Sequence, residues 1–171
     1  MDVSTTETEI DDKLLPNLYH REYAVFVDHA LQEITGEFEK DKRLSDKTLL
    51  NLYNLFGETF ERGLELYEQN RITGIITSNS TSIGISKERT DARWLLQVKG
   101  FSGETYTIFP NINFCNCQAF RSQVLNKRTS FTCKHVLAVW LASLDKSKLE
   151  YKEVTHQQFQ DLLQYLFSNK S

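Results

Sequence analysis

The 171-residue sequence has no apolar run long enough to cross a membrane. Its longest run, Val136–Ala142, is far shorter than the roughly 18–20 residues that a spanning helix needs. The first fifteen residues are polar and acidic, unlike the apolar core of a secretory signal peptide. With 40% hydrophobic and 25% charged residues, the composition is that of an ordinary globular protein. We therefore expect one domain, or one domain with an appended arm, that makes no membrane contact.

The sequence also lacks an excess of basic residues. Its formal net charge is −3, and its isoelectric point is about 5.8. Such a chain has no overall positive field with which to hold nucleic acid, so any DNA contact would depend on a local patch. The composition therefore argues against an autonomous DNA-binding protein.

Cysteine is scarce, and motifs of the common enzyme classes are absent. The three cysteines are an odd number that cannot pair completely, and no secretory signal precedes them. We expect a reducing compartment, the cytosol or the nucleus, where thiolates persist as metal ligands. No Ser-His-Asp, Walker-type or dinucleotide-binding pattern occurs, and the zinc deaminase signature is missing.

The three cysteines and one histidine form a single pattern. Cys115 and Cys117 make a Cys-x-Cys pair, and after fifteen intervening residues Cys133 and His135 make Cys-x-His. Three thiolates and one imidazole complete the tetrahedral shell of a zinc ion and leave no position open for water or substrate. The pattern predicts one structural Zn²⁺. The alternative is that these are small buried cysteines beside an unrelated Cys-His dipeptide.

The local structure expected at this site favours metal binding. In an extended segment Cys115 and Cys117 point to the same side, so both reach one metal ion. Cys133 precedes a strongly apolar helical run, and the partial positive charge of a helix N-terminus stabilises its thiolate. Lys127, Arg128 and Lys134 lie near the site in the sequence and would offset its negative charge. Alternatively these three and Arg121 contact a partner or nucleic acid.

The helix expected after His135 has no polar face for two turns. A helix that is apolar on every side must be covered on every side. The sheet would cover one side, and the N-terminal helices would cover the other. The alternative is that part of this helix is a partner interface with Trp140 as its anchor.

Apolar periodicity predicts helices at the start of the chain. One helix spans Arg21–Lys40, and a second begins after Ser45, a favourable N-cap, and continues to Gln69. Gly57 and Gly63 inside the second helix indicate close packing or local loosening. Near the end of the chain, residues 155–167 have capping-box spacing and an apolar stripe, which predicts a short C-terminal helix.

The middle of the chain has the composition of strands. Residues 71–78 are rich in β-branched side chains, and the Ser/Thr-rich stretch 79–92 predicts a surface loop. Two further strands are expected at 93–99 and 104–109, joined by a turn at 100–103 that contains two glycines.

The Cys-x-Cys…Cys-x-His pattern, preceded by a hairpin and followed by a helix, resembles the SWIM zinc finger. The continuation to Ala138, Cys-x-His-x-x-Ala, is similar to one SWIM group, the SWIM-domain subunit of the Shu complex in homologous recombination. About residues 46–145 take part in the resemblance. Beyond the ligands it covers Asn51–Gly57, Arg71–Thr73, the strand around Tyr106, Cys117–Phe120, Ser122–Leu125 and Cys133–Val139.

The resemblance implies a non-enzymatic nuclear subunit with zinc on the four ligands and Ala138 as a small packing residue below the site. Members of the family pair with a RecA-like recombinase paralogue, in a heterodimer or larger complex. They promote assembly of the recombinase filament on single-stranded DNA. This implies filament contact, direct or indirect, and contact with single-stranded DNA only as part of the complex. The expected function ranks ahead of a direct DNA-binding finger and of a thiol-based redox enzyme.

We expect an α+β fold with an N-terminal helical pair, a three-stranded antiparallel sheet, a SWIM ββα finger and a short C-terminal helix. The corresponding division is a disordered acidic tail at 1–15, a helical region at 16–70, the SWIM domain at 71–145 with its finger core at 93–145, and the C-terminal helix at 146–171.

Overall fold

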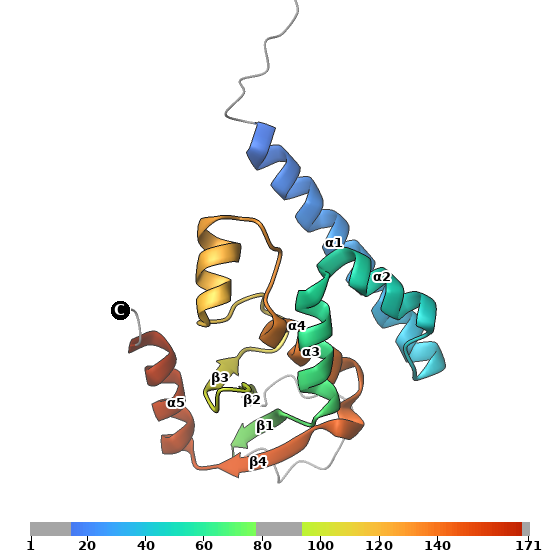
Figure 1. The fold of residues 1–171 in the computed structure, drawn as a ribbon. Helices are drawn as coiled ribbons and strands as arrows, with labels where there is room; N and C mark the ends of the chain where they lie inside the picture. Colours follow the sequence, from blue (N-terminus) through green and yellow to red (C-terminus); the bar gives the residue numbers. More distant parts are fainter. Residues whose placement is uncertain (1–14, 78–93, 169–171) are drawn as a thin grey trace, which may run out of the picture.

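The computed structural model describes residues 15–77 and 94–168. The predicted acidic tail, apart from residue 15, and the predicted 79–92 loop lie outside these residues. The described part is a mixed α+β fold, as expected from the sequence (Figure 1). Its elements are α1 (Leu15–Asp41), α2 (Asp46–Phe56), α3 (Glu58–Glu68), β1 (Ile72–Thr77), β2 (Trp94–Lys99), β3 (Thr105–Ile108), the π-helix η2 (Phe120–Asn126), α4 (Lys134–Leu144), the short 3₁₀ helix η3 (Lys146–Lys148), β4 (Glu150–Val154) and α5 (His156–Ser168). None of the helices in these ranges is both long and apolar enough to cross a bilayer.

The predicted N-terminal helical pair is wrong, because three helices occupy this region. The second predicted helix is interrupted at Gly57, whose φ of 54° and ψ of −137° are accessible to glycine and costly for other residues. Ser45 caps α2 as expected, with its hydroxyl accepting a hydrogen bond from the Thr48 amide at 3.1 Å. The chain therefore turns between α2 and α3, and α3 is free to follow its own direction.

Gly63 marks a close contact between α3 and α4. A Cβ atom at Gly63 would lie 3.0 Å from the Lys134 carbonyl oxygen and 3.1 Å from the Leu137 Cβ. An added side chain would be this close to α4, so the two backbones can approach as they do only because glycine has no side chain. From the sequence, each glycine could mark close packing or a local loosening of the helix. Gly57 marks the loosening, and Gly63 marks the close packing.

The expected three-stranded antiparallel sheet has a fourth strand. The order is β3-β2-β1-β4, with antiparallel pairing except between β1 and β4, which run parallel. Strand β4 lies within the segment predicted to be only a C-terminal helix. Four of its five residues are exposed and three of those carry charge, as is common for strands that protect a sheet edge.

The parallel pairing brings Tyr151 over Gly74, its register partner in β1. A Cβ at Gly74 would lie 2.6 Å from the Tyr151 ring. Glycine within a strand often marks such a close approach. A larger residue at position 74 would therefore displace the Tyr151 ring.

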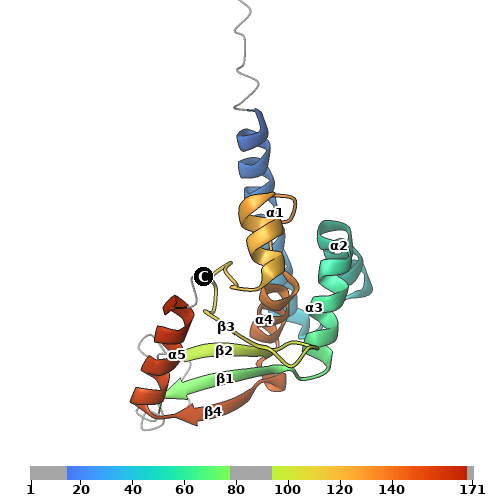
Figure 2. The same ribbon diagram turned by 60° about the vertical axis from the view of Figure 1, so that its left-hand side comes forward.

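The sheet separates two apolar layers. Because side chains alternate along a strand, Leu96 faces the core formed with α3 and α4, whereas Leu95 faces Phe159 of α5. Figure 2 shows α5 at one end of the sheet, away from α3 and α4. The predicted capping box is present, with reciprocal hydrogen bonds of 3.0 and 3.2 Å between Thr155 and Gln158.

Helix α1 is only partly covered by the rest of the described fold. Val27, Ile34 and Phe38 of its predicted stripe are buried, but Tyr23 and Phe26 of the same stripe are 41% and 60% exposed. In Figure 1 the first half of α1 extends beyond the other elements. An apolar stripe that continues past the body leaves α1 with unburied surface.

Candidate metal centre

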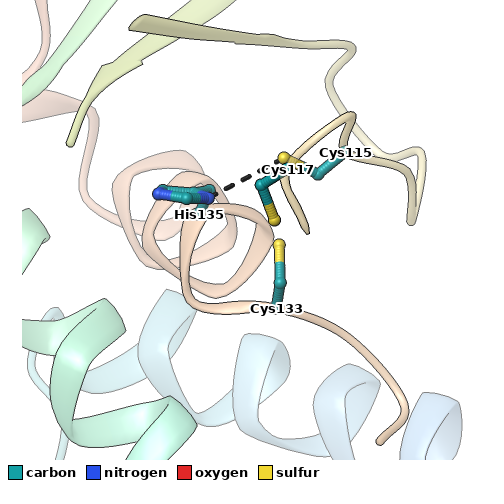
Figure 3. Close-up of side chains that lie close together, drawn as sticks. All are labelled: Cys115, Cys117, Cys133 and His135. Atoms are coloured by element: carbon teal, nitrogen blue, oxygen red, sulfur yellow. Dashed lines mark hydrogen bonds between the residues drawn. The ribbon is translucent and has the colours of Figure 1, made fainter. Parts of the chain in front are cut away.

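The four predicted ligands come together in one buried group. One ligand atom from each of Cys115, Cys117, Cys133 and His135 lies within 4.8 Å of the other three. All four residues are buried, and the three thiols form no disulfide (Figure 3). This arrangement could hold one zinc ion, as the spacing predicts, and it excludes the alternative that the cysteines and the Cys-His dipeptide are unrelated.

Cys115 and Cys117 lie on the coil that follows β3. The Asn113 side chain donates a hydrogen bond to the Phe131 carbonyl at 3.0 Å and thereby ties this coil to the segment before Cys133. The Phe120 amide donates to Cys117 Sγ at 3.3 Å. An amide donor of this kind stabilises a thiolate and orients it before a metal ion is bound.

Cys133 is the N-cap of α4, as expected from the sequence. Its backbone is extended, with φ −117° and ψ 165°, and its carbonyl accepts from the Leu137 amide at 3.1 Å. The thiol therefore lies at the partly positive end of a helix. His135 follows in the first helical turn, so α4 and its N-cap supply two ligands and the coil after β3 supplies the other two.

His135 is positioned by a neighbour that the spacing did not indicate. The Tyr106 ring in β3 stacks on the imidazole with centroids 4.0 Å apart and an interplanar angle of 25°. The Nδ1 atom of His135 faces Cys115 Sγ at 3.8 Å, the contact drawn as a dashed line in Figure 3. The Tyr106 hydroxyl donates to Glu104, and this bond is the main reason that the pKa of Tyr106 is raised. Only the family resemblance, which includes this strand, pointed to Tyr106.

The electrostatics of the thiols fit a divalent cation. Hydrogen bonds with Cys117 and Cys133, and then burial, raise the pKa of the Cys115 thiol. Hydrogen bonds from Cys115 and Cys133 lower the pKa of Cys117. The three thiols are thus coupled, and a cation would compensate the negative charge of a thiolate in this buried place. Bound there, Zn²⁺ would link the coil after β3 to the start of α4.

The other predicted site residues are distributed over several elements. Ala138 is fully buried in the same core cluster as the three cysteines, and Trp140 is half-buried. The Lys134 ammonium lies 5.8 Å from the centre of the Phe101 ring, at the β2–β3 turn. Arg121 belongs to η2, and Lys127 and Arg128 follow it; all three are exposed.

Arg71 was not predicted as part of this neighbourhood. Its guanidinium lies 4.7 Å from the Phe101 ring centre and donates to the Gly100 carbonyl at 3.3 Å. These contacts hold the β2–β3 turn against the start of β1. Lys134 and Arg71 both lie near the Phe101 ring at the β2–β3 turn.

The chain has relatives of known name. A human protein named zinc finger SWIM domain-containing protein 7 is 33% identical over 137 residues, which cover 80% of this chain and 89% of the relative. The mouse protein of the same name is also 33% identical, with 80% and 82% covered. A Dictyostelium discoideum homolog of that protein is 30% identical over 112 residues, 66% of this chain and 65% of its own length.

No protein-family model matches the chain, and no solved structure matches it. The matches to the human and mouse proteins each cover 80% of this chain, and the match to the Dictyostelium discoideum homolog covers 66%. Together with the buried Cys₃His group, the similarity to the human protein places this chain in the family of zinc finger SWIM domain-containing protein 7.

Proposed function

We propose that this chain is a non-enzymatic, zinc-stabilised subunit of a Shu-type complex in the nucleus. In this role it pairs with a RecA-like recombinase paralogue and promotes assembly of the recombinase filament on single-stranded DNA. The family membership and the resemblance of the finger motif to the Shu subunit support the proposal.

The observation that carries the proposal is the closed, buried ligand group. Four protein ligands fill the shell of a tetrahedral zinc ion, whereas catalytic zinc sites keep a position for water or substrate. Across residues 15–77 and 94–168 no second group of three or more metal-ligating side chains was found. A site of this kind stabilises a fold and does not transform a substrate.

The position of the metal centre supports an interaction role. Helix α4 begins at two of the ligands and continues into the core between α3, the sheet and α1. Zinc bound by these residues would fix the start of α4 relative to the coil after β3. The surfaces that surround α4 would then be presented to a partner in one arrangement.

The test is reconstitution with a RecA-like paralogue from the same organism. We expect the two proteins to co-purify as a stable complex that accelerates loading of the recombinase onto single-stranded DNA, measured by fluorescence of labelled DNA. Chelated protein should lose the partner and regain it with Zn²⁺ but not with Mg²⁺. If no RecA-like paralogue binds, or if the complex leaves filament assembly unchanged, the proposed function is wrong.

Direct binding of DNA by the finger is the second candidate function. It rests on the exposed Arg121, Lys127 and Arg128, which lie on η2 and the residues after it. The formal net charge of −3 argues against it. A mobility-shift series with the chain alone decides: absence of single-stranded DNA binding even at about 50 mM salt excludes an autonomous DNA-binding role.

A further inference from the structure

A groove lies between α1, α4 and the coil that precedes the metal ligands. Its volume is about 300 Å³. Leu31 of α1, Ile112 of the coil and Trp140 of α4 are among the apolar side chains that line it. The Asn113–Phe131 hydrogen bond joins two lining residues, so the coil side of the groove is held in place.

The groove is the open side of an otherwise enclosed helix. Ala138, Leu141 and Ala142 of α4 are buried against the rest of the fold and do not line the groove, whereas Val136, Trp140 and Ser143 are only half-buried and line it. The sequence left open whether α4 is covered entirely by its own core or partly by a partner. The described residues cover most of it and leave this side accessible.

Two polar features of the groove indicate what could enter it. Thr132 is only 3% exposed, yet its hydroxyl oxygen has no hydrogen-bond partner among the described residues. A buried hydroxyl without a partner is costly, and an incoming backbone or side-chain group could pair with it. Asp28, on α1, is the single charged residue among the described residues that line the groove.

Helix α1, which carries Asp28, is acidic along its described length. From residue 22 to its end, α1 exposes six carboxylates against one lysine, Lys40, and one histidine, His29, whose Nδ1 lies 3.7 Å from Glu33 Oε1. The carboxylates are Glu22, Asp28, Glu33, Glu37, Glu39 and Asp41. A partner segment with positive charge beside an apolar residue would complement Asp28 and the acidic character of α1.

We propose that the groove receives a segment of the partner protein in which a large apolar side chain is flanked by lysine or arginine. The apolar side chain packs against Ile112 and Trp140, the basic residue pairs with Asp28, and a polar group of the segment pairs with the Thr132 hydroxyl. This inference deepens the proposed function and rests on it, because the partner is taken to be the RecA-like paralogue.

Trp140 provides a direct reporter of the groove. The chain contains two tryptophans, and the other, Trp94, packs in β2 on the core cluster around the cysteines. Full-length protein loaded with zinc and labelled with 5-fluorotryptophan should give two fluorine resonances, assigned with Trp94→Phe. Addition of the RecA-like paralogue should shift the Trp140 resonance and leave that of Trp94 in place.

Matched variants separate the groove from the rest of the surface. Ile112→Glu and Asp28→Lys should each weaken paralogue binding at least about tenfold. The first introduces a charge at an apolar contact, and the second reverses the sign of the charge at position 28. Leu50→Glu on α2 and Glu61→Lys on α3 make the same kinds of change at exposed positions outside the groove. They should alter binding by less than about twofold. Circular dichroism and zinc content establish that each variant is folded.

The outcomes are distinguishable. If the paralogue binds but neither groove variant weakens it and Trp140 does not respond, the groove inference is wrong and the proposed function stands. If no paralogue binds wild-type protein, the proposed function fails.

The groove is then tested with a helical leucine–lysine peptide and its leucine–glutamate counterpart. A Trp140 shift with the first alone, abolished by Asp28→Lys, supports the groove, and no shift overturns it. A Trp140 shift that depends only on the concentration of this chain shows a second copy in the groove and also overturns the proposal.

Discussion

Helix α4 meets α3 and α1 in different ways. Against α3, Gly63 allows the backbones to touch, and Tyr67 of α3 also donates a hydrogen bond to Asp145 at the end of α4 at 3.0 Å. Against α1, the contact includes Leu31 and Ile34 but leaves the groove along Trp140. The difference indicates that the α3 side of α4 and the metal centre fix the fold, whereas the α1 side presents a surface.

Removal of zinc should have the largest effect, because it acts on the fixed side. Structural zinc contributes roughly 10–16 kcal/mol of apparent free energy in small fingers. The net stability of a domain is only about 5–15 kcal/mol. Chelation or His135→Ala should therefore abolish the cooperative thermal transition measured by circular dichroism and expose the amides of α4 to hydrogen exchange.

The matched control for this prediction is His156→Ala. His156 lies in the first turn of α5, outside the ligand group, and is exposed. It should keep the zinc content and the melting temperature of the wild type. A zinc-free protein that melts at the wild-type temperature would show that the metal does not hold the fold.

Gly63→Ala tests the α3–α4 contact directly. The added Cβ would meet a backbone carbonyl at 3.0 Å, which cannot move as a side-chain tip would. Overpacking of this kind costs about 1–3 kcal/mol, more than the gain of up to about 1 kcal/mol from the better helix former. Urea unfolding of the zinc-loaded protein would measure the loss.

The matched control is Gly36→Ala on α1, where an added Cβ meets nothing within 4 Å. There the helical preference of alanine should act alone and stabilise the protein by about 0.5–1 kcal/mol. A lower unfolding free energy for Gly63→Ala and a higher one for Gly36→Ala would support the contrast between α3 and α1 as neighbours of α4. Equal destabilisation at both positions would remove it.

Two valines on α4 compare a buried and a half-buried position beside the groove with one chemical change. Val139 is buried in the core cluster, whereas Val136 is half-buried and lines the groove, as does part of Val139. Val139→Ala should cost about 1–3 kcal/mol in unfolding free energy, and Val136→Ala less than about half as much. Equal costs would mean that the groove side is as tightly packed as the core.

The metal ligands could be predicted because residue type and spacing alone identify a set of zinc donors. Four donors in a zinc pattern need no knowledge of the fold, and the N-cap position of Cys133 follows from the apolar run after it. Short-range signals such as the Ser45 cap and the Thr155–Gln158 box were confirmed for the same reason. Each depends on residues that are neighbours in the sequence.

Features that depend on distant residues could not be predicted. Strand β4 is defined by its pairing with β1, and its charged, exposed residues hide any alternation. The stacking of Tyr106 on His135 joins β3 to α4, and the groove exists only where α1, α4 and a coil meet. For Gly57 the sequence indicated a special role but not which one. A backbone angle, not composition, decided that the helix is broken there.

The smallest expected effect concerns Asp145, which links the end of α4 to α3. Hydrogen bonds from the Ser147 hydroxyl and from Tyr67 hold the pKa of this carboxyl below its ordinary value. Because the pKa is lower in the folded protein, the stabilisation is fully present above the unfolded pKa of about 3.9 and is lost as the pH falls through the folded value. Asp145→Asn should thus cost about 0.5–1 kcal/mol, the range for a partly exposed hydrogen bond, and the cost should be the same at about pH 7.5 and 5.5. Urea unfolding at the two pH values, with exposed Asp41→Asn as the control, measures it. A cost that changes between these pH values would mean that a group with a higher pKa controls this end of the α3–α4 contact.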